Sequence, residues 1–487
     1  MALVLGVDSS TQSVKVEVRD VETGALVSSG RAAHPPTTPP VSEQSPEAWW
    51  DAFVLAARDA LKTVDRGDVV AISVAGQQHG MVALDANGVA VHPAKLWNDT
   101  ESAEESRRLL SSLDPGEWAA ATGSVPVAAF TITKLAWLRA HHPSSYARMA
   151  TVLLPHDELN RRLTGRFATD RGDASGTGYW SPATGEWRID LLSRIDPDRN
   201  WRTALPDVVM PFGAVGQLTP DAAQALGLST AVSVGAGTGD NMGAALGLGL
   251  VAGDVVISLG TSGTVYAVSD TPTADSTGAV AGFADATGRF LPLVCTLNAM
   301  KVTDAAARLL GVDHAEFESL VLAATPGAGG LVLVPYLDGE RTPNRPDATG
   351  TLSGMRSDVS RPQFARAAVE GVVCGLLDGL DALGVAGVRT DGRLLLIGGG
   401  ARSAAFRRVV ADLAQRRVTV PVADEHVAVG AALQAAVMWS IQTSSGDPST
   451  VLGALRRQWS LGGGEVTVPD LTVDAAAIRA AYAIARG

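Results

Sequence analysis

The chain has 487 residues, more than a single hydrophobic core usually serves, so the sequence predicts two domains. With 46% hydrophobic and 18% charged residues, the composition excludes a disordered or fibrous protein. The 39 basic and 51 acidic residues give a formal charge of -12, which disfavours a nucleic-acid groove, and we expect no nucleic-acid partner.

The hydropathy of the chain predicts a cytoplasmic protein that does not enter a membrane. The apolar run at the N-terminus stops at Asp8 and has no basic flank, so it is not typical of a secretory signal. The most apolar stretch, residues 243–253, is short and rich in glycine, and it could not cross a bilayer.

Two similar β-hairpins are predicted, one in each half of the chain. Residues 3–7 are apolar, residues 9–13 make a polar turn, and apolar and charged residues then alternate. The same order of strand, polar turn and strand returns at residues 255–268. Because the copies lie about half a chain length apart, they predict a duplicated domain, with one copy over residues 1–248 and the other over 249–487.

Helices and strands alternate around these hairpins. Ser45 and Pro46 predict a helix start, because serine caps helices and proline suits the first helical position. Buried strands are predicted at residues 69–74, 231–235 and 394–397, and an amphipathic helix at residues 406–413. Residues 34–40 are rich in proline and predict a stiff surface loop. The alternation indicates the α/β class with mixed sheets.

Two common nucleotide motifs are missing. None of the five lysines follows a glycine, so the chain has no Walker A sequence, which excludes a P-loop NTPase. Ser403 stands where the third glycine of G-x-G-x-x-G belongs, which weakens a dinucleotide-binding interpretation. Any phosphate must therefore be held by another arrangement.

The turns of the two hairpins are candidates for that arrangement. Tight turns of small, hydroxylated residues leave backbone N–H groups that converge on an anion. Either turn alone would more often be an ordinary hairpin turn, but their occurrence in both halves favours a phosphate site. Asp8, beside the first turn, suits a hydrated Mg²⁺ ion, and capping of the turn is the alternative.

Two glycine-rich turns are further candidates. Residues 398–403 follow a buried strand and precede a helix, which suits close approach to a nucleoside, although many α/β turns look similar. Asp240 lies in the turn at residues 235–241 and could cap a helix. The alternative is a base that orients and deprotonates an attacking hydroxyl in phosphoryl transfer.

A polar set follows the buried strand at residues 69–74. Gln78 and His79 lie between glycines, and Trp97 and Asp99 come soon after. Amide, imidazole, indole and carboxylate groups suit the hydroxyls and the apolar face of a polyol. A lone histidine is more often structural, but its hydrogen-bonding neighbours favour a ligand role for His79.

Taken together, these segments resemble the FGGY family of carbohydrate kinases over most of the chain. Residues 6–15 are similar to the first phosphate motif of the family, residues 260–264 to its second and residues 398–403 to its adenosine motif. Residues 131–138 and 350–371 are similar to its two signatures. The resemblance implies two ribonuclease H-like, actin-like domains with a cleft between them.

The resemblance also implies ATP and Mg²⁺ as cofactors, with Asp8 near the metal. The residues it implies for nucleotide binding are Asp8, Thr11, Gln12, Ser13, Lys15, Gly260, Thr261, Ser262, Gly263, Thr264, Gly399, Gly400, Ala401 and Ser403.

Within the family, residues 76–80, 96–99, 173–176 and 336–343 are similar to those of members that phosphorylate D-xylulose. This similarity implies that ATP and D-xylulose give ADP and D-xylulose 5-phosphate, with Asp240 as proton acceptor. The residues implied to lie at the sugar are Gln78, His79, Trp97, Asp99 and Asn241. Many of these members carry methionine in place of Gln78, so ribulose, xylitol or another pentitol stays open as the acceptor.

Two other classes stay open as well. An actin-like or chaperone-like ATPase would share the phosphate turns but would have no use for the polar set around His79. A catalytically silent sugar sensor would have no need of Asp8 and Asp240. The sequence also leaves a homodimer open.

Overall fold

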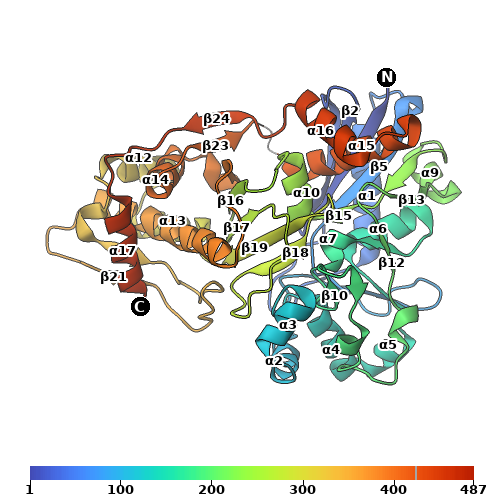
Figure 1. The fold of residues 1–487 in the computed structure, drawn as a ribbon, viewed down its shortest axis with the longest axis horizontal. Helices are drawn as coiled ribbons and strands as arrows, with labels where there is room; N and C mark the ends of the chain where they lie inside the picture. The colour runs from blue at the N-terminus through green and yellow to red at the C-terminus, as the bar shows by residue number, and fades with distance from the viewer. Residues whose placement is uncertain (423–424) are drawn as a thin grey trace.

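The computed structural model describes residues 1–422 and 425–487, and its two large sheets are seven-stranded, mixed and flanked by helices (Figure 1). In spatial order, the first sheet contains β13 (Ala214–Gln217), β14 (Ser233–Gly235), β5 (Val69–Gly76), β1 (Leu3–Ser9), β2 (Ser13–Asp20) and β3 (Leu26–Ala33), with β15 (Thr238–Gly239) also beside β5. The second contains β18 (Ala281–Ala284), β19 (Phe290–Thr296), β17 (Gly263–Ala267), β16 (Val255–Leu259), β22 (Leu394–Ile397), β23 (Val418–Pro421) and β24 (Gly464–Thr467).

The two sheets repeat one topology. β1 pairs antiparallel with β2 and parallel with β5, and β16 pairs antiparallel with β17 and parallel with β22. On the far side, each parallel strand has a further parallel neighbour, β14 or β23, and then an antiparallel edge strand. The predicted hairpins and the duplicated α/β architecture are therefore confirmed.

Helices are found in both halves of the chain. Those of the first half are α1 (Pro46–Ala60), α2 (Ala103–Ser111), α3 (Pro115–Thr122), α4 (Thr131–His141), α5 (Pro143–Arg148), α6 (Pro155–Thr164), α7 (Arg171–Ala174), α8 (Ile189–Leu192), α9 (Pro220–Leu226) and α10 (Asp240–Gly247). Those of the second half are α11 (Met300–Leu310), α12 (His314–Ala323), α13 (Arg361–Val385), α14 (Ala404–Ala414), α15 (His426–Ser444), α16 (Pro448–Gln458) and α17 (Ala475–Arg486). As predicted, α1 begins after the N-cap Ser45, whose side chain accepts a hydrogen bond from the Glu47 N–H.

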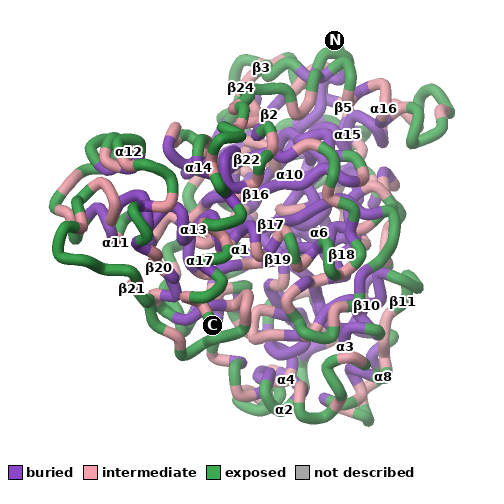
Figure 2. Tube along the Cα trace, turned by 60° about the vertical axis from the view of Figure 1, so that its left-hand side comes forward, coloured by how far each residue is buried: buried purple, intermediate pink, exposed green. Residues whose placement is uncertain are grey.

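Helices α10 and α15 join the two halves. Although α15 lies near the end of the chain, it packs on β1 and β5 of the first sheet and on α10. Both helices are largely buried (Figure 2), and one apolar cluster contains their side chains together with Val4 of the first sheet and Val256 of the second. A domain division near residue 248 stays a prediction, because α15 crosses back over it.

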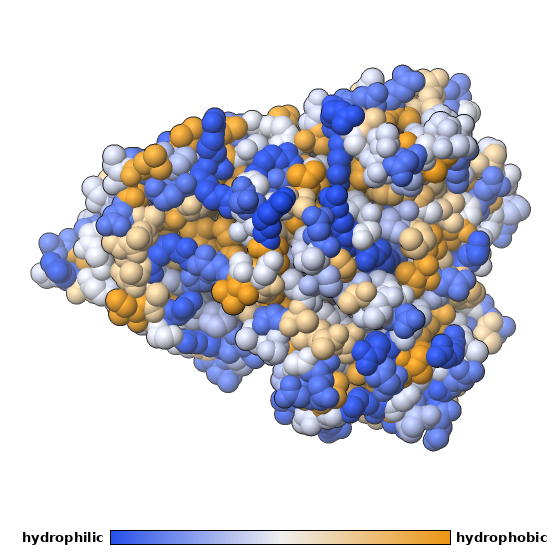
Figure 3. Space-filling view, viewed as in Figure 1, coloured by the Kyte–Doolittle hydropathy of each residue, from blue (hydrophilic) through white to orange (hydrophobic). Residues whose placement is uncertain are grey.

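The surface is mixed in character. Hydrophobic and hydrophilic side chains alternate over the face in Figure 3, and the outline is indented between the C-terminal half and the lobe that holds α2 to α5. In the described parts of the chain, no helix is both long enough and apolar enough to pass through a membrane.

Candidate active site

Three neighbouring strands of the first sheet end at one place. β1 runs parallel to β5 with Ser9 opposite Gly76, and β15 pairs with the end of β5 so that Gly239 also lies opposite Gly76. The carboxyl ends of parallel strands are the usual position of ligands in α/β sheets. This topology brings together Asp8 at the end of β1, the polar residues that follow β5, and Asp240, which follows β15.

Asp240 is the first residue of α10, and Gly239 occupies the N-cap position. The Asp240 side chain therefore does not cap the helix in the usual way. Its Oδ1 accepts hydrogen bonds from the backbone N–H of Asn241 (2.7 Å) and from Asn241 Nδ2 (3.0 Å). Burial, and then the nearby charge of Asp8, raise the pKa of Asp240 to about 7. A carboxylate with this pKa can accept a proton near neutral pH.

Asp8 is a buried carboxylate, and one of its two oxygens accepts no hydrogen bond from the residues described. Lys15 Nζ lies 3.6 Å from Asp8 Oδ2, whereas Asp8 Oδ1 is buried and has no hydrogen-bond partner among the residues described. Burial raises the pKa of Asp8 to about 6, although the Lys15 charge opposes the shift. Such an oxygen fits a hydrated Mg²⁺ ion, which prefers hard oxygen ligands and keeps several of its waters.

His79 is fixed from three sides. Its Nδ1 lies 2.7 Å from the carbonyl oxygen of Gly176, its ring stacks on Phe130 at 4.8 Å between centroids, and its own carbonyl accepts from Thr131 Oγ1 at 3.1 Å. The backbone is left-handed there, with φ of 65°, a conformation that surrounding structure must enforce. Burial lowers the pKa of His79 to about 3, so the ring is neutral. Since Nδ1–H donates to Gly176, Nε2 is left as an acceptor.

Gln78 and Asn241 form a second polar pair beside Asp240. Asn241 Nδ2 donates to Gln78 Oε1 at 3.0 Å, so this amide hydrogen-bonds both Gln78 and Asp240. Gln78 Nε2 is buried and lacks a partner among the described residues. A buried amide donor without a partner is a suitable contact for a substrate oxygen.

Trp97 and Asp99 lie in different surroundings. Trp97 is 40% exposed, and its Nε1 donates to Thr11 Oγ1 at 2.9 Å, so it touches the turn that joins β1 to β2. Asp99 has no exposed surface, and its oxygens accept from the backbone of Ser42 and Glu101 and from Lys95. The structure thus places Trp97 against the turn and buries Asp99 among Ser42, Lys95 and Glu101.

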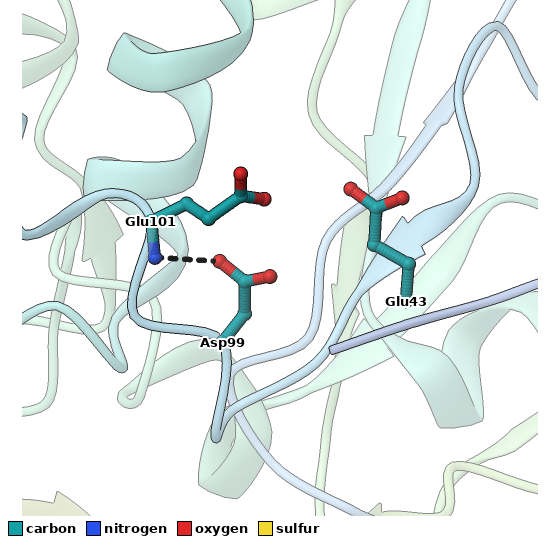
Figure 4. Close-up of side chains that lie close together, drawn as sticks. All are labelled: Glu43, Asp99 and Glu101. Carbon is teal, nitrogen blue, oxygen red and sulfur yellow. Dashed lines mark hydrogen bonds between the residues drawn. The ribbon is translucent and has the colours of Figure 1, made fainter. Parts of the chain in front are cut away.

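Glu43, Asp99 and Glu101 point toward one another in a cluster that could suit a metal ion (Figure 4). The buried Lys95 occupies that position. Its Nζ lies 2.9 Å from Glu43 Oε1, 3.0 Å from Asp99 Oδ2 and 2.6 Å from Glu101 Oε2, and also 3.7 Å from the centroid of the Trp137 ring. We call this group the Lys95 cage and assign it a structural role.

A cavity of about 540 Å³ in the second half brings together two of the predicted nucleotide motifs. Gly260 and Thr261 of the second turn line it, as do Gly399, Gly400 and Ser403. Four other predicted nucleotide residues do not line the cavity, namely Ser262, Gly263, Thr264 and Ala401. Of these, Ala401 is buried, and Gly263 and Thr264 are paired within the second sheet. The rest of the wall includes residues that the sequence did not indicate, namely Met300, Thr303, Asp304, His314, Phe317 and Glu318.

The remaining predicted residues surround the first turn. Thr11 Oγ1 accepts from Trp97 and donates to Gln77 Oε1 at 3.0 Å, and Lys15 Nζ forms a 2.5 Å ion pair with Glu425. Gln12 lies in the loop that joins β1 to β2, and Ser13 is the first residue of β2. The sequence did not indicate Phe130, whose ring stacks on His79, or Phe283, whose ring centroid lies 5.5 Å from that of His79.

Comparison with known proteins identifies the family. Residues 3–247 match the N-terminal domain of the FGGY family of carbohydrate kinases, and residues 255–439 match its C-terminal domain. The chain belongs to this family. This FGGY kinase is 46% identical over 465 residues to the xylulose kinase of Streptomyces rubiginosus, covering 95% of the chain and 92% of that relative.

Solved structures agree with this assignment. The crystal structure of xylulose kinase from Bifidobacterium adolescentis has a TM-score of 0.88 and 41% identity to this FGGY kinase, covering 100% of the chain and 99% of that structure. The crystal structure of Plasmodium falciparum glycerol kinase has a TM-score of 0.87 and 19% identity, and the match covers 100% of the chain and 98% of that structure. At this identity, the match shows a shared fold alone. Family membership implies that ATP is the phosphoryl donor and that a small carbohydrate is the acceptor.

Replacing His79 with asparagine should weaken sugar binding far more than nucleotide binding. Asparagine tolerates a positive φ and can still donate to the Gly176 carbonyl, so the loop should be retained while the Nε2 acceptor is lost. We expect the sugar KM to rise roughly tenfold or more and the ATP KM to stay within about twofold, in steady-state assays. His141→Asn, at the exposed end of α4, is the matched control. Equal changes in both constants would mean that His79 is only structural.

Proposed function

We propose that this FGGY kinase transfers the γ-phosphoryl group of ATP to D-xylulose, giving ADP and D-xylulose 5-phosphate. The observation that carries the proposal is Asp240, a carboxylate with a pKa raised to about 7 that lies beside Asn241 and Gln78 at the ends of the strands. The names of the relatives that cover nearly the whole chain support xylulose as the acceptor.

In the proposed reaction, Asp240 takes the proton of the attacking hydroxyl. A bond forms between that oxygen and the γ-phosphorus, while the bond from the γ-phosphorus to the β,γ-bridging oxygen breaks and its electrons leave with ADP. His79 Nε2 would accept a hydrogen bond from the sugar, and Gln78 Nε2 would donate one. Asp8 would hold Mg²⁺ through its waters, and this ion supplies charge neutralisation to the phosphates when it is bound.

The nucleotide would lie in the cavity of the second half. Gly260 and Thr261 would contact phosphate, and the glycines at 399 and 400 would allow the adenosine to approach the backbone. The turn needs a glycine at position 398, because φ is +86° there and a Cβ would lie 2.6 Å from the Leu259 carbonyl oxygen. The two halves would then deliver sugar and phosphate to one cleft.

A coupled ADP-release assay with Mg-ATP tests the proposal on a panel of D-xylulose, D-ribulose, xylitol and glycerol. We expect D-xylulose to give the highest kcat/KM and sugar-free turnover to be slow, because the bound sugar completes the site. A higher kcat/KM for ribulose or a pentitol would mean that this compound is the preferred acceptor, and the proposed phosphoryl transfer would still hold. ATP hydrolysis that is equally fast without sugar would contradict the proposal and favour an actin-like or chaperone-like ATPase.

A further inference from the structure

The first phosphate turn is held from behind by two side chains. The carbonyl oxygen of Ser10 accepts from His34 Nδ1 at 2.9 Å, and that of Thr11 accepts from Gln44 Nε2 at 2.9 Å. The carbonyl oxygen of Gln12 accepts from the His34 backbone N–H at 2.8 Å. Three consecutive carbonyls of the turn are therefore directed toward the segment that contains His34 and Gln44.

The orientation of these carbonyls fixes the opposite side of the turn. A trans peptide is planar, with its N–H pointing away from its C=O, and these peptides are trans. The N–H groups of Thr11, Gln12 and Ser13 must therefore point away from the two side chains. Among the residues described, the N–H groups of Thr11 and Gln12, which lie between the two strands, have no hydrogen-bond acceptor. Successive unpaired N–H groups of this kind form an anion-binding nest.

The side chain of Gln44 has only one orientation that satisfies its neighbours. The indole of Trp49 can only donate, and its Nε1 lies 2.7 Å from Gln44 Oε1. The amide NH₂ must then face the turn, where it donates to Thr11 and also to the Pro35 carbonyl at 2.6 Å. Gln44 is 3% exposed and Trp49 is fully buried, so solvent cannot easily replace these bonds.

His34 is equally well defined. The proline-rich sequence predicted that residues 34–40 form a surface loop. His34 is only 6% exposed, so the prediction was wrong for this residue. Burial lowers the pKa of His34, which favours the neutral ring, and the contact with the Ser10 carbonyl oxygen requires the proton on Nδ1. Nδ1 carries a proton in the charged ring as well, so His34 donates to the turn in either state.

The Lys95 cage anchors Gln44. β4 (Glu43–Gln44) pairs antiparallel with β7 (Ala94–Lys95), and Glu43 is one of the carboxylates around Lys95 (Figure 4). The acidic cluster in Figure 4 thus fixes the strand from which Gln44 reaches the turn.

The second phosphate turn is held in the same manner by different groups. The carbonyl of Gly260 accepts from the Met300 N–H at 3.0 Å, and that of Thr261 accepts from the Ala299 N–H at 3.3 Å, both at the start of α11. In the second half, backbone groups take the place that His34 and Gln44 have in the first. In both halves of the duplicated fold, hydrogen-bond donors therefore hold the carbonyls of the turn. This repetition argues that the orientation of the peptides matters in both turns.

We propose that His34 and Gln44 are positioning residues that keep the N–H groups of the first turn directed at the phosphates of bound nucleotide. This inference rests on the proposed function, in which that turn binds phosphate. Without the two donors, a peptide of the turn could rotate and present a carbonyl oxygen, which repels phosphate instead of binding it.

Paired substitutions test the inference. His34→Leu removes the side-chain donor, whereas His34→Asn keeps an N–H near the position of Nδ1. Gln44→Glu keeps the acceptor for Trp49 but loses both donated bonds. We expect the ATP KM, and the Kd for ADP from calorimetric titration, to rise about tenfold or more in His34→Leu and Gln44→Glu. The sugar KM should stay within about twofold, and His34→Asn should restore nucleotide binding to within about threefold of the native protein.

Gln224→Glu, the same chemical change on the exposed face of α9, is the control and should match the native protein. Equal rises in both KM values, or His34→Asn as weak as His34→Leu, would overturn the inference. If thermal melting shows that Gln44→Glu does not fold, the His34 pair decides. If the native protein releases no ADP with any sugar, the proposed function fails, while the ADP titration still decides whether the two residues position the turn.

Discussion

Replacing Asp240 with asparagine should lower kcat by roughly a thousandfold while the protein stays folded. Among the residues described, the side chain accepts hydrogen bonds through Oδ1 alone, from Asn241, and asparagine can supply that oxygen. What the variant loses is the capacity to take a proton from the sugar hydroxyl. Steady-state kinetics with saturating Mg-ATP and sugar measure the effect, and circular dichroism checks the fold. If kcat stays near that of the native protein, Asp240 is not the base.

The pH dependence of activity should report the same group. Asp240 must be ionised to accept a proton, and its pKa is raised from 3.8 to about 7 by burial and by Asp8. In the native protein, kcat/KM should therefore fall as the pH drops below about 7. The residual activity of Asp240→Asn should not show this fall at low pH. If the variant shows the same fall, a group other than Asp240 causes it.

The same shift predicts that the carboxylate costs stability. A carboxyl whose pKa is raised on folding binds its proton more tightly in the folded state, so stability declines as the pH rises from about 4 to about 7. Asp240→Asn should therefore melt higher than the native protein at pH 8, by roughly 2 °C, and lose this advantage near pH 4. A variant that melts lower at pH 8 would show that the charge stabilises the fold.

Local patterns predicted much of this fold because they depend on neighbouring residues. The alternation after the turn at residues 9–13 identified a hairpin, and Ser45 with Pro46 marked the start of α1. Asp240, His79 and the glycine turns stood out because polar or glycine residues interrupt apolar strands. These signals lie within a few positions along the chain, and the topology then determines which of them meet.

Features that depend on distant contacts were not predictable in this way. Asp99 looks like a sugar ligand in the sequence, and that contact stays a prediction, but no local pattern indicated that Lys95 and the Ser42 N–H would both donate to its Oδ2. His34 looks like part of a loop, yet it is buried behind the first turn. Phe283 reaches His79 only because β18 of the second sheet lies against the first half. Such assignments require the positions of segments that are far apart in sequence.

The contact between α10 and α15 is the clearest case of a distant constraint. A Cβ on Gly430 of α15 would overlap the carbonyl oxygen of Gly243, and one on Gly247 of α10 would lie 2.7 Å from the Gly430 nitrogen. These glycines let two helix backbones touch, because no side chain stands between them. Since α10 begins at Asp240, the separation of the helices also determines where the proposed base lies.

Gly430→Ala should consequently lower both stability and turnover. The added methyl group meets backbone, which cannot move aside as a flexible side chain would, so the helices must separate. We expect the melting temperature to fall by roughly 5 °C or more, kcat to fall with it, and Gly430→Val to be worse than alanine. Gly384→Ala is the matched control in α13, because a Cβ there would meet no atom within 4 Å. Alanine is the better helix former, so the control should be neutral or slightly stabilising. If Gly430→Ala melts as Gly384→Ala does, the two helices can part without cost, and their close packing does not hold Asp240 in place.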